Sequence, residues 1–154
     1  MRIVLASDHA GVHLKAALAE HLAATTTHHV EDIGTYTEEP VDYPPICANA
    51  ARHVVRGQAD FAIVIGGSGQ GEQMAANKVH GIRAALCHDE YTARFARRHN
   101  DANVLSLGAR LIAPDLACAI LDVFLSSSFD GGRHAARIAE IEEIEIFEAG
   151  GTLE

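Results

Sequence analysis

The stretch FAIVIGGSGQGEQMAANK, residues 61–78, is the strongest indication of the fold in this sequence. Its first five residues, 61–65, form an apolar run typical of a buried strand, and helix-forming residues follow the glycines. Glycines let the backbone approach a ligand closely, and free N–H groups at a helix start attract anionic oxygens. We therefore predict a ligand-binding loop over 66–71, with the carboxylate of Glu72 in the first helical turn after it.

Short apolar runs alternate with helical patterns along the whole chain, which is typical of a parallel β-sheet covered by helices on both faces. At 154 residues, the chain fits a single domain of the α/β class. Strands are predicted at 2–7, 29–33, 61–65, 82–87 and 104–107, a loop over 35–45, and helices at 12–24, 46–55, from the glycine loop to 77, and at 90–99, 114–125 and 133–147.

The loops that follow the strands of such a sheet lie at one edge, because the crossovers are right-handed. Asp8 and His9 come after the first predicted strand, and the glycine loop follows the third. His88 and Asp89 follow the fourth strand, and 108–110 follow the fifth. We expect these segments to converge on one crevice.

Composition excludes several classes of protein. A net charge of −9 argues against a nucleic-acid-binding surface. No apolar run approaches the ~20 residues of a membrane helix, and the apolar stretch at the N-terminus is too short for a signal peptide. We therefore predict a cytoplasmic protein that binds neither nucleic acid nor a membrane.

Neither the cysteines nor the histidines have the spacing of a metal site. Cys47, Cys87 and Cys118 lack a C-x-x-C spacing and lie in apolar surroundings, so buried free thiols are expected. The ten histidines include no H-x-x-x-H pair on a predicted helix. We predict no metal site.

The glycine loop matches neither common nucleotide-binding pattern. It lacks the lysine of a Walker loop and fits a dinucleotide fingerprint only in part, so an anion-binding loop and a tight structural turn both stay open. A carboxylate beside such a loop would repel a phosphate. The pair suits an oxyanion that develops while Glu72 abstracts a proton next to a carbonyl, with Ser68 able to exchange a proton with a hydroxyl. The alternative is a glutamate that only benefits from the helix dipole.

Other polar residues suit acid–base and phosphate chemistry. His99 lies at a helix-to-strand junction, and His9 ends the first strand. Arg133 and Arg137 are four residues apart, hence on one helical face, where two guanidinium groups suit a terminal phosphate. The competing interpretation is a set of surface salt bridges with the neighbouring glutamates.

The last predicted helix places Ile138, Ile141 and Ile144 on one stripe among glutamates. No strand follows this helix, so the stripe packs either on a partner subunit or on its own domain.

Seven short motifs together resemble the ribose-5-phosphate isomerase B family, which includes the galactose-6-phosphate isomerases of the LacAB type. The similarity runs in order from residue 2 to about 145. The motifs are Asp8-His9-Ala10-Gly11, Asp42-Tyr43-Pro44, Gly66-Gly67-Ser68-Gly69-x-Gly71-Glu72, Ala75-Ala76-Asn77-Lys78, Gly81-Ile82-Arg83-Ala84, His99-Asn100-Asp101-Ala102-Asn103 and Gly132-Arg133-His134-x-x-Arg137.

This resemblance implies a three-layer α/β/α, Rossmann-like sandwich with a five-stranded parallel sheet and an extra C-terminal helix. One domain would cover 1–154, with a frayed tail after about 148. The resemblance also implies a homodimer whose two sites draw residues from both subunits, and such dimers could pair into tetramers. It implies neither a metal nor an organic cofactor.

The implied reaction is the interconversion of D-ribose 5-phosphate and D-ribulose 5-phosphate through a cis-enediolate, a step of the pentose phosphate pathway. Glu72 would move the proton between C2 and C1, and His99 would open the furanose ring. Ser68 would assist proton movement between oxygens. The substrate-binding residues implied are Asp8, His9, Tyr43, Gly67, Gly69, Gly71, Asn100, Arg110, Arg133 and Arg137, of which His9 and the three arginines would hold the phosphate.

One branch of the family has a cysteine base where this chain has Gly66 and an apolar residue where it has Glu72. This chain resembles the branch with a glutamate base. Two alternatives remain open: the same chemistry on an allose, galactose or tetrose phosphate, and a non-catalytic sugar-phosphate-binding module.

Overall fold

A five-stranded, fully parallel sheet forms the centre of the protein, which the computed structural model describes over residues 1–150. The strand order is β2-β1-β3-β5-β4. The strands are β1 (Arg2–Ser7), β2 (His29–Asp32), β3 (Phe61–Gly66), β4 (Ala84–Leu86) and β5 (Val104–Gly108), and the helices are α1 (Val12–Thr25), α2 (Tyr43–Val55), α3 (Gln70–Ala76), α4 (Glu90–Asn100), α5 (Pro114–Ser126) and α6 (Arg133–Glu148), with a short 3₁₀ turn at His9–Gly11.

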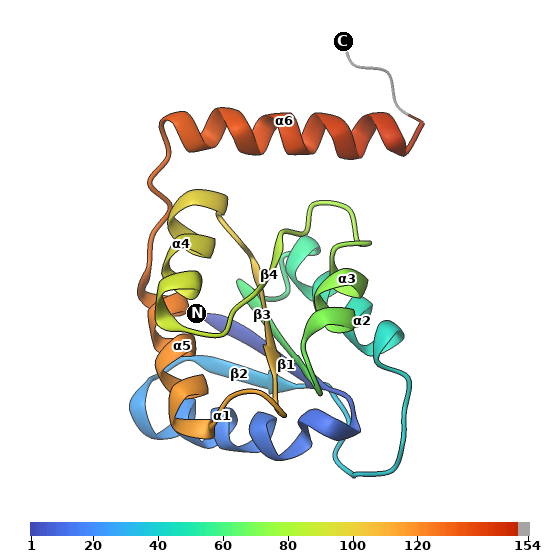
Figure 1. The fold of residues 1–154 in the computed structure, drawn as a ribbon, viewed down its shortest axis with the longest axis vertical. Coiled ribbons are helices and arrows are strands. Elements are labelled where there is room, and N and C mark those ends of the chain that lie inside the picture. The colour runs from blue at the N-terminus through green and yellow to red at the C-terminus, as the bar shows by residue number, and fades with distance from the viewer. Residues whose placement is uncertain (151–154) are drawn as a thin grey trace.

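The three central strands, β1, β3 and β5, bury both of their faces, and successive side chains point to opposite sides of the sheet. In β3, Ile63 and Ile65 join a core with α1, α4 and α5, whereas Ala62 and Val64 join a second core with α2 and α3. Figure 1 shows the sheet between these two helical layers. The predicted three-layer α/β/α fold and all five strands are therefore confirmed.

The main differences from the predicted element boundaries concern α2 and β4. The loop expected over 35–45 ends earlier, because α2 begins at Tyr43 with prolines in its first turn, where a missing N–H costs no hydrogen bond. Strand β4 is shorter than expected and pairs only with β5. The backbone N–H of Arg83, just before β4, donates instead to the Asn103 side chain.

The last helix lies apart from the two helical layers. In Figure 1, α6 crosses the top of the molecule above α4 and the start of β5. Only Ile138 of its apolar stripe is buried, whereas Ile141 and Ile144 are 49% and 63% exposed. The helix ends at Glu148, and the tail expected to fray lies largely in 151–154, outside the described residues.

Candidate active site

The glycine loop joins the carboxyl end of β3 to the start of α3. Gly69 has a φ of +77°, and a Cβ there would lie 2.5 Å from a Leu86 methyl group, so only glycine fits. The buried hydroxyl of Ser106 donates to the Gly69 carbonyl at 2.7 Å, and the N–H of Gln70 donates to Ser68 Oγ at 3.3 Å. These bonds fix the loop at the point where the first N–H groups of α3 have no partner within the helix.

Glu72 turns its carboxyl group back toward the end of β3. It is only 4% exposed, and a Cβ placed on Gly66 would lie 1.8 Å from its Oε1. The pKa of the Glu72 carboxyl is raised, chiefly because the group is buried, and the negative charge of the neighbouring Asp8 raises it further. Hydrogen bonds from the backbone of Glu72 and of Gly69 lower the pKa and offset part of this rise. The raised pKa brings this carboxylate closer to the basicity that a general base needs near neutral pH.

Asp8 stands beside Glu72 as a second carboxylate. It is 7% exposed and caps the 3₁₀ turn after β1, because its Oδ1 accepts hydrogen bonds from the N–H groups of Ala10 at 2.8 Å and Gly11 at 3.2 Å. Its backbone N–H donates to the carbonyl of Ile65, at the end of β3. The two carboxylates are thus held at adjacent strand ends.

These groups open on a cavity of about 400 Å³. Arg110 closes one side: its backbone N–H donates to the Gly67 carbonyl at 3.0 Å, and its guanidinium group packs over Gly67. Tyr43 closes another side, with its phenol ring against Gly71. The lining residues are Asp8, Tyr43, Gly67, Ser68, Gly71, Glu72, Arg110 and Leu111.

The structure therefore brings together seven of the residues expected from the sequence. Leu111 also lines the cavity and was not predicted from the sequence. Its position directly after Arg110 could have indicated it. His9 lies beside Asp8 without lining the cavity, and its Nδ1 accepts a hydrogen bond from the Val41 N–H. Two larger hollows, of about 540 and 700 Å³, adjoin α6 and contain none of the glycine-loop residues.

The expectation that His88 and Asp89 converge on the same crevice is wrong. They follow β4, which is separated from β3 by β5, and neither residue lines the cavity. Asp89 instead caps α4, where its Oδ1 accepts a hydrogen bond from the Thr92 N–H at 2.7 Å.

A second group of expected residues lies at the opposite edge of the sheet. Val104, the first residue of β5, pairs with Ala62, whereas Gly108 pairs with Gly66 at the glycine loop. At about 3.3 Å per residue, β5 separates its two ends by about 13 Å. His99 and Asn100 end α4 just before β5, and they are therefore remote from Glu72 within one subunit.

The α6 residues lie close to His99 rather than to Glu72. The His99 ring stacks on the His134 ring, with centroids 4.1 Å apart and planes 9° apart, and His99 Nε2 lies 3.9 Å from Asp130 Oδ2. Burial lowers the pKa of His134, and the neighbouring His99, Arg133 and Arg137 lower it further, against the opposing charge of Asp130. The two guanidinium groups of Arg133 and Arg137 thus lie near His134, which stacks on His99 and was assigned no role from the sequence.

The cysteines are free among the described residues, and none is a candidate base. Cys47 and Cys87 are buried, and burial raises the pKa of their thiols to about 12 and about 11. Cys118 is half-buried, which corrects the expectation that all three are buried.

Over residues 1–150, no group of three histidine, cysteine or acidic side chains is arranged to hold a metal ion. Within the same range, no helix has the length and apolarity needed to cross a membrane.

Comparisons with known proteins agree on one group of relatives. A family model described as Ribose/Galactose Isomerase matches residues 3–141. The ribose-5-phosphate isomerase B of Escherichia coli is 40% identical over 144 residues, which cover 94% of this chain and 96% of the relative.

Solved structures show the same fold. Ribose-5-phosphate isomerase B of Clostridium thermocellum is 48% identical with a TM-score of 0.92, over 94% of this chain and 97% of that chain. The Mycoplasma genitalium enzyme of the same name, solved with bound ribulose-5-phosphate, is 42% identical with a TM-score of 0.89, over 94% of this chain and 95% of that one.

Proposed function

Because this chain belongs to the Ribose/Galactose Isomerase family, we propose that it interconverts D-ribose 5-phosphate and D-ribulose 5-phosphate. The chain is an isomerase, and several of its relatives carry the name ribose-5-phosphate isomerase B, whereas others are named only as sugar phosphate isomerases. The Mycoplasma structure with bound ribulose-5-phosphate supports this substrate for the present chain.

Glu72 acts as the base in this proposal. It takes the proton from C2 of the open-chain aldose and returns it to C1 of the cis-enediolate, so that no net proton is gained or lost. The observation that carries the proposal is the buried Glu72 carboxyl, with its raised pKa, beside the glycine loop in one cavity. N–H groups from Gly67 to Glu72, including those of Gly69 and Gly71, stabilise the charge that develops on the enediolate oxygen.

The other cavity residues orient the sugar. Ser68 assists proton movement between the two reacting oxygens, Asp8 accepts hydrogen bonds from sugar hydroxyls, and Tyr43 lines the site. Arg110 and His9 bind phosphate oxygens, for which a guanidinium fork is well suited.

A second copy of the chain completes the site in this proposal. His99 opens the furanose ring, Asn100 holds the sugar, and Arg133 and Arg137 bind the phosphate, yet these four residues lie at the far edge of the sheet from Glu72. A homodimer in which each subunit supplies them to the other brings both groups together. The exposed Ile141 and Ile144 of α6 support such an interface, since a subunit contact would bury them.

The family description also includes galactose isomerases, so the substrate range needs a direct test. Turnover on pentose, hexose and tetrose phosphates should be measured with EDTA present. We expect the highest kcat/KM on ribose 5-phosphate, unaffected by EDTA. A higher kcat/KM on another phosphosugar would reassign the substrate, and loss of turnover in EDTA would contradict the metal-free mechanism. No turnover on any of these sugars would favour a binding module. A cytoplasmic location stays a prediction from the sequence.

A further inference from the structure

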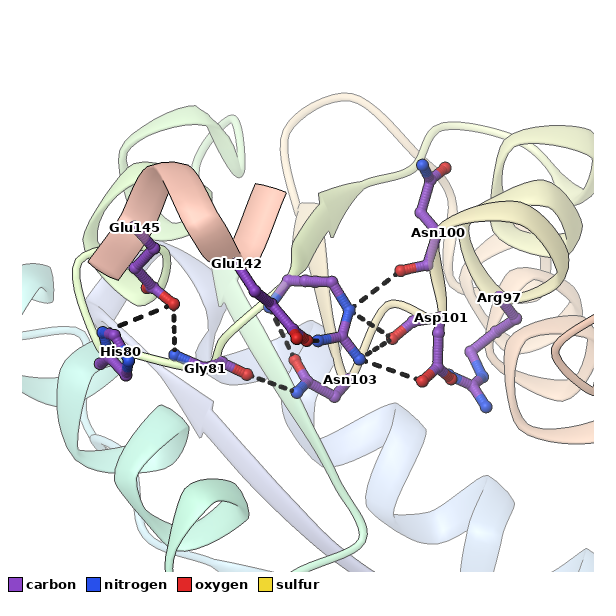
Figure 2. Close-up of polar contacts among 9 residues, drawn as sticks. His80, Gly81, Arg97, Asn100, Asp101, Asn103, Glu142 and Glu145 are labelled. Atoms are coloured by element: carbon purple, nitrogen blue, oxygen red, sulfur yellow. Dashed lines mark hydrogen bonds and ion pairs between the residues drawn. The ribbon is translucent and has the colours of Figure 1, made fainter. Parts of the chain in front are cut away.

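Arg83, which has no role in the proposed catalysis, is the centre of a polar network whose partners Asn100, Asp101, Asn103 and Glu142 are labelled in Figure 2. Its side chain is 20% exposed, and its Nε donates to the carbonyls of Asn100 at 3.0 Å and Asp101 at 3.1 Å. Its Nη2 donates to the Asp101 carbonyl and to Asp101 Oδ2, both at 3.0 Å. Its Nη1 donates to Glu142 Oε1 of α6 at 3.3 Å. One guanidinium group therefore contacts both the end of α4 and the middle of α6.

The contacts to α4 fix the turn in which the helix ends. The last carbonyls of a helix have no partner within it, and a cation there also complements the helix dipole. Asp101 has a φ of +44°, a left-handed conformation that is strained for a residue with a side chain. Arg83 satisfies the carbonyls on one side of this turn, and Arg97 donates to Asp101 Oδ1 at 2.7 Å on the other.

The segment that carries Arg83 is itself held in place. Asn103 accepts a hydrogen bond from the Arg83 N–H at 2.9 Å and donates to the Gly81 carbonyl at 3.0 Å. Glu145 of α6 accepts a hydrogen bond from the Gly81 N–H at 3.0 Å and lies 3.5 Å from His80 Nδ1. Figure 2 shows His80 and Gly81 beneath Glu145, with the end of α4 on the other side of the network. The network thus fixes α6 and the end of α4 relative to each other.

We propose that Arg83 is a positioning residue for isomerisation, which holds His99 and Asn100 at the orientation needed by the neighbouring subunit's site. This inference rests on the proposed function, in which those two residues act on the sugar. Arg83 bonds the carbonyl of Asn100, directly after His99, and its link to Glu142 keeps α6 where the His134 ring stacks on His99. Arg83 itself does not touch the substrate.

Arg83→Met removes the guanidinium group and its hydrogen bonds while keeping much of the side-chain volume. Because a displacement of about 1 Å at a catalytic group can cost about a hundredfold in rate, we expect kcat to fall about tenfold to a hundredfold. Arg56→Met makes the same charge change at an exposed position at the end of α2, and we expect wild-type kcat from it. Glu142→Gln weakens only the link to α6 and leaves the contacts of Arg83 to the end of α4, so its kcat should fall less than that of Arg83→Met.

A mutant cycle separates positioning from general destabilisation. If Arg83 acts through His99 and Asn100, Arg83→Met should lower kcat by less than about twofold when His99→Asn and Asn100→Ala are already present. A loss of the same size in both backgrounds, or a loss in Glu142→Gln equal to that in Arg83→Met, would contradict the assignment.

The His99 and His134 ring signals in NMR give a readout that needs no activity. Arg83→Met should change the chemical shifts of the His99 ring, and Arg56→Met should not; unchanged His99 signals would overturn the proposal. Should Arg83→Met fail to fold, Arg83→Lys keeps the charge without the fork and should shift the His99 signals in the same direction. If the wild type does not turn over ribose 5-phosphate, the proposed function fails, while this NMR comparison still decides the role of Arg83.

Discussion

The carboxyl group of Glu72 occupies the space that any side chain at Gly66 would need. A Cβ on Gly66 would lie 1.8 Å from Oε1 and 2.2 Å from the carboxyl carbon of Glu72. In the proposed mechanism, this chain supplies the base from position 72, in space that a side chain at position 66 would otherwise fill. The closeness of these two residues explains why a glycine ends β3 at the site.

Gly66→Ala should displace the Glu72 carboxyl and leave the fold intact, because the obstructing atoms are the end of a flexible side chain. We expect kcat to fall about a hundredfold, as for a base moved by about 1 Å, with little change in the thermal unfolding midpoint. Steady-state kinetics and calorimetry measure both quantities. The same substitution in a Glu72→Gln background should have no further effect on kcat, and an unchanged kcat in Gly66→Ala alone would place the base elsewhere.

Glu72→Gln should also change how stability depends on pH. The folded protein raises the pKa of this carboxyl, so it binds the proton more tightly than the unfolded chain does. The stability of the wild type therefore falls as the pH rises from the ordinary glutamate pKa through the raised value, and the glutamine variant lacks this fall. Urea unfolding at about pH 4 and about pH 8 should show the variant gaining stability relative to the wild type at the higher pH. A difference that does not vary with pH would mean that the pKa is not raised.

Arg137→Ala tests whether Arg137 binds the phosphate group of the substrate. Arg137 is exposed and forms no ion pair among residues 1–150, so it is free to bind a substrate anion. Because a charge-assisted hydrogen bond contributes more than a neutral one, we expect KM for ribose 5-phosphate to rise about tenfold or more. Arg56→Ala serves as the matched control, with wild-type KM expected. A KM that does not change in Arg137→Ala would remove this residue from the site.

Mixed subunits test whether two copies share one site. Glu72→Gln and His99→Asn are each expected to inactivate a homodimer. When subunits exchange freely, about half of the dimers are mixed, and each mixed dimer keeps one site with both native residues, so about a quarter of wild-type activity should return. Activity measured before and after exchange gives the answer. If none returns although mixed dimers form, each subunit must hold its own complete site.

The sequence predicted most of the fold because its apolar runs alternate regularly with helical patterns. Glu72 could be found because it directly follows a glycine loop at a strand end. The strand order could not be predicted in this way. Because β4 lies at the sheet edge beyond β5, the prediction that His88 lines the crevice was wrong. The helical start at Tyr43 was hidden by two prolines that look like a loop.

The contacts of Arg83 could not be predicted either. They join residues 17 to 59 positions apart through backbone carbonyls and the side chains of Asp101 and Glu142, and such partners leave no periodic pattern in a sequence. The stacking of His99 on His134 could not be predicted for the same reason, since it depends on how α6 crosses the end of α4.

The turnover of Glu72→Gln on ribose 5-phosphate tests the central claim most directly. The substitution keeps the size of the side chain and removes its basicity. We expect kcat to fall about a thousandfold, within the range that a general base contributes, while the oligomeric state and the binding of ribulose 5-phosphate by calorimetry stay as in the wild type. A near-normal kcat in this variant would show that Glu72 is not the base.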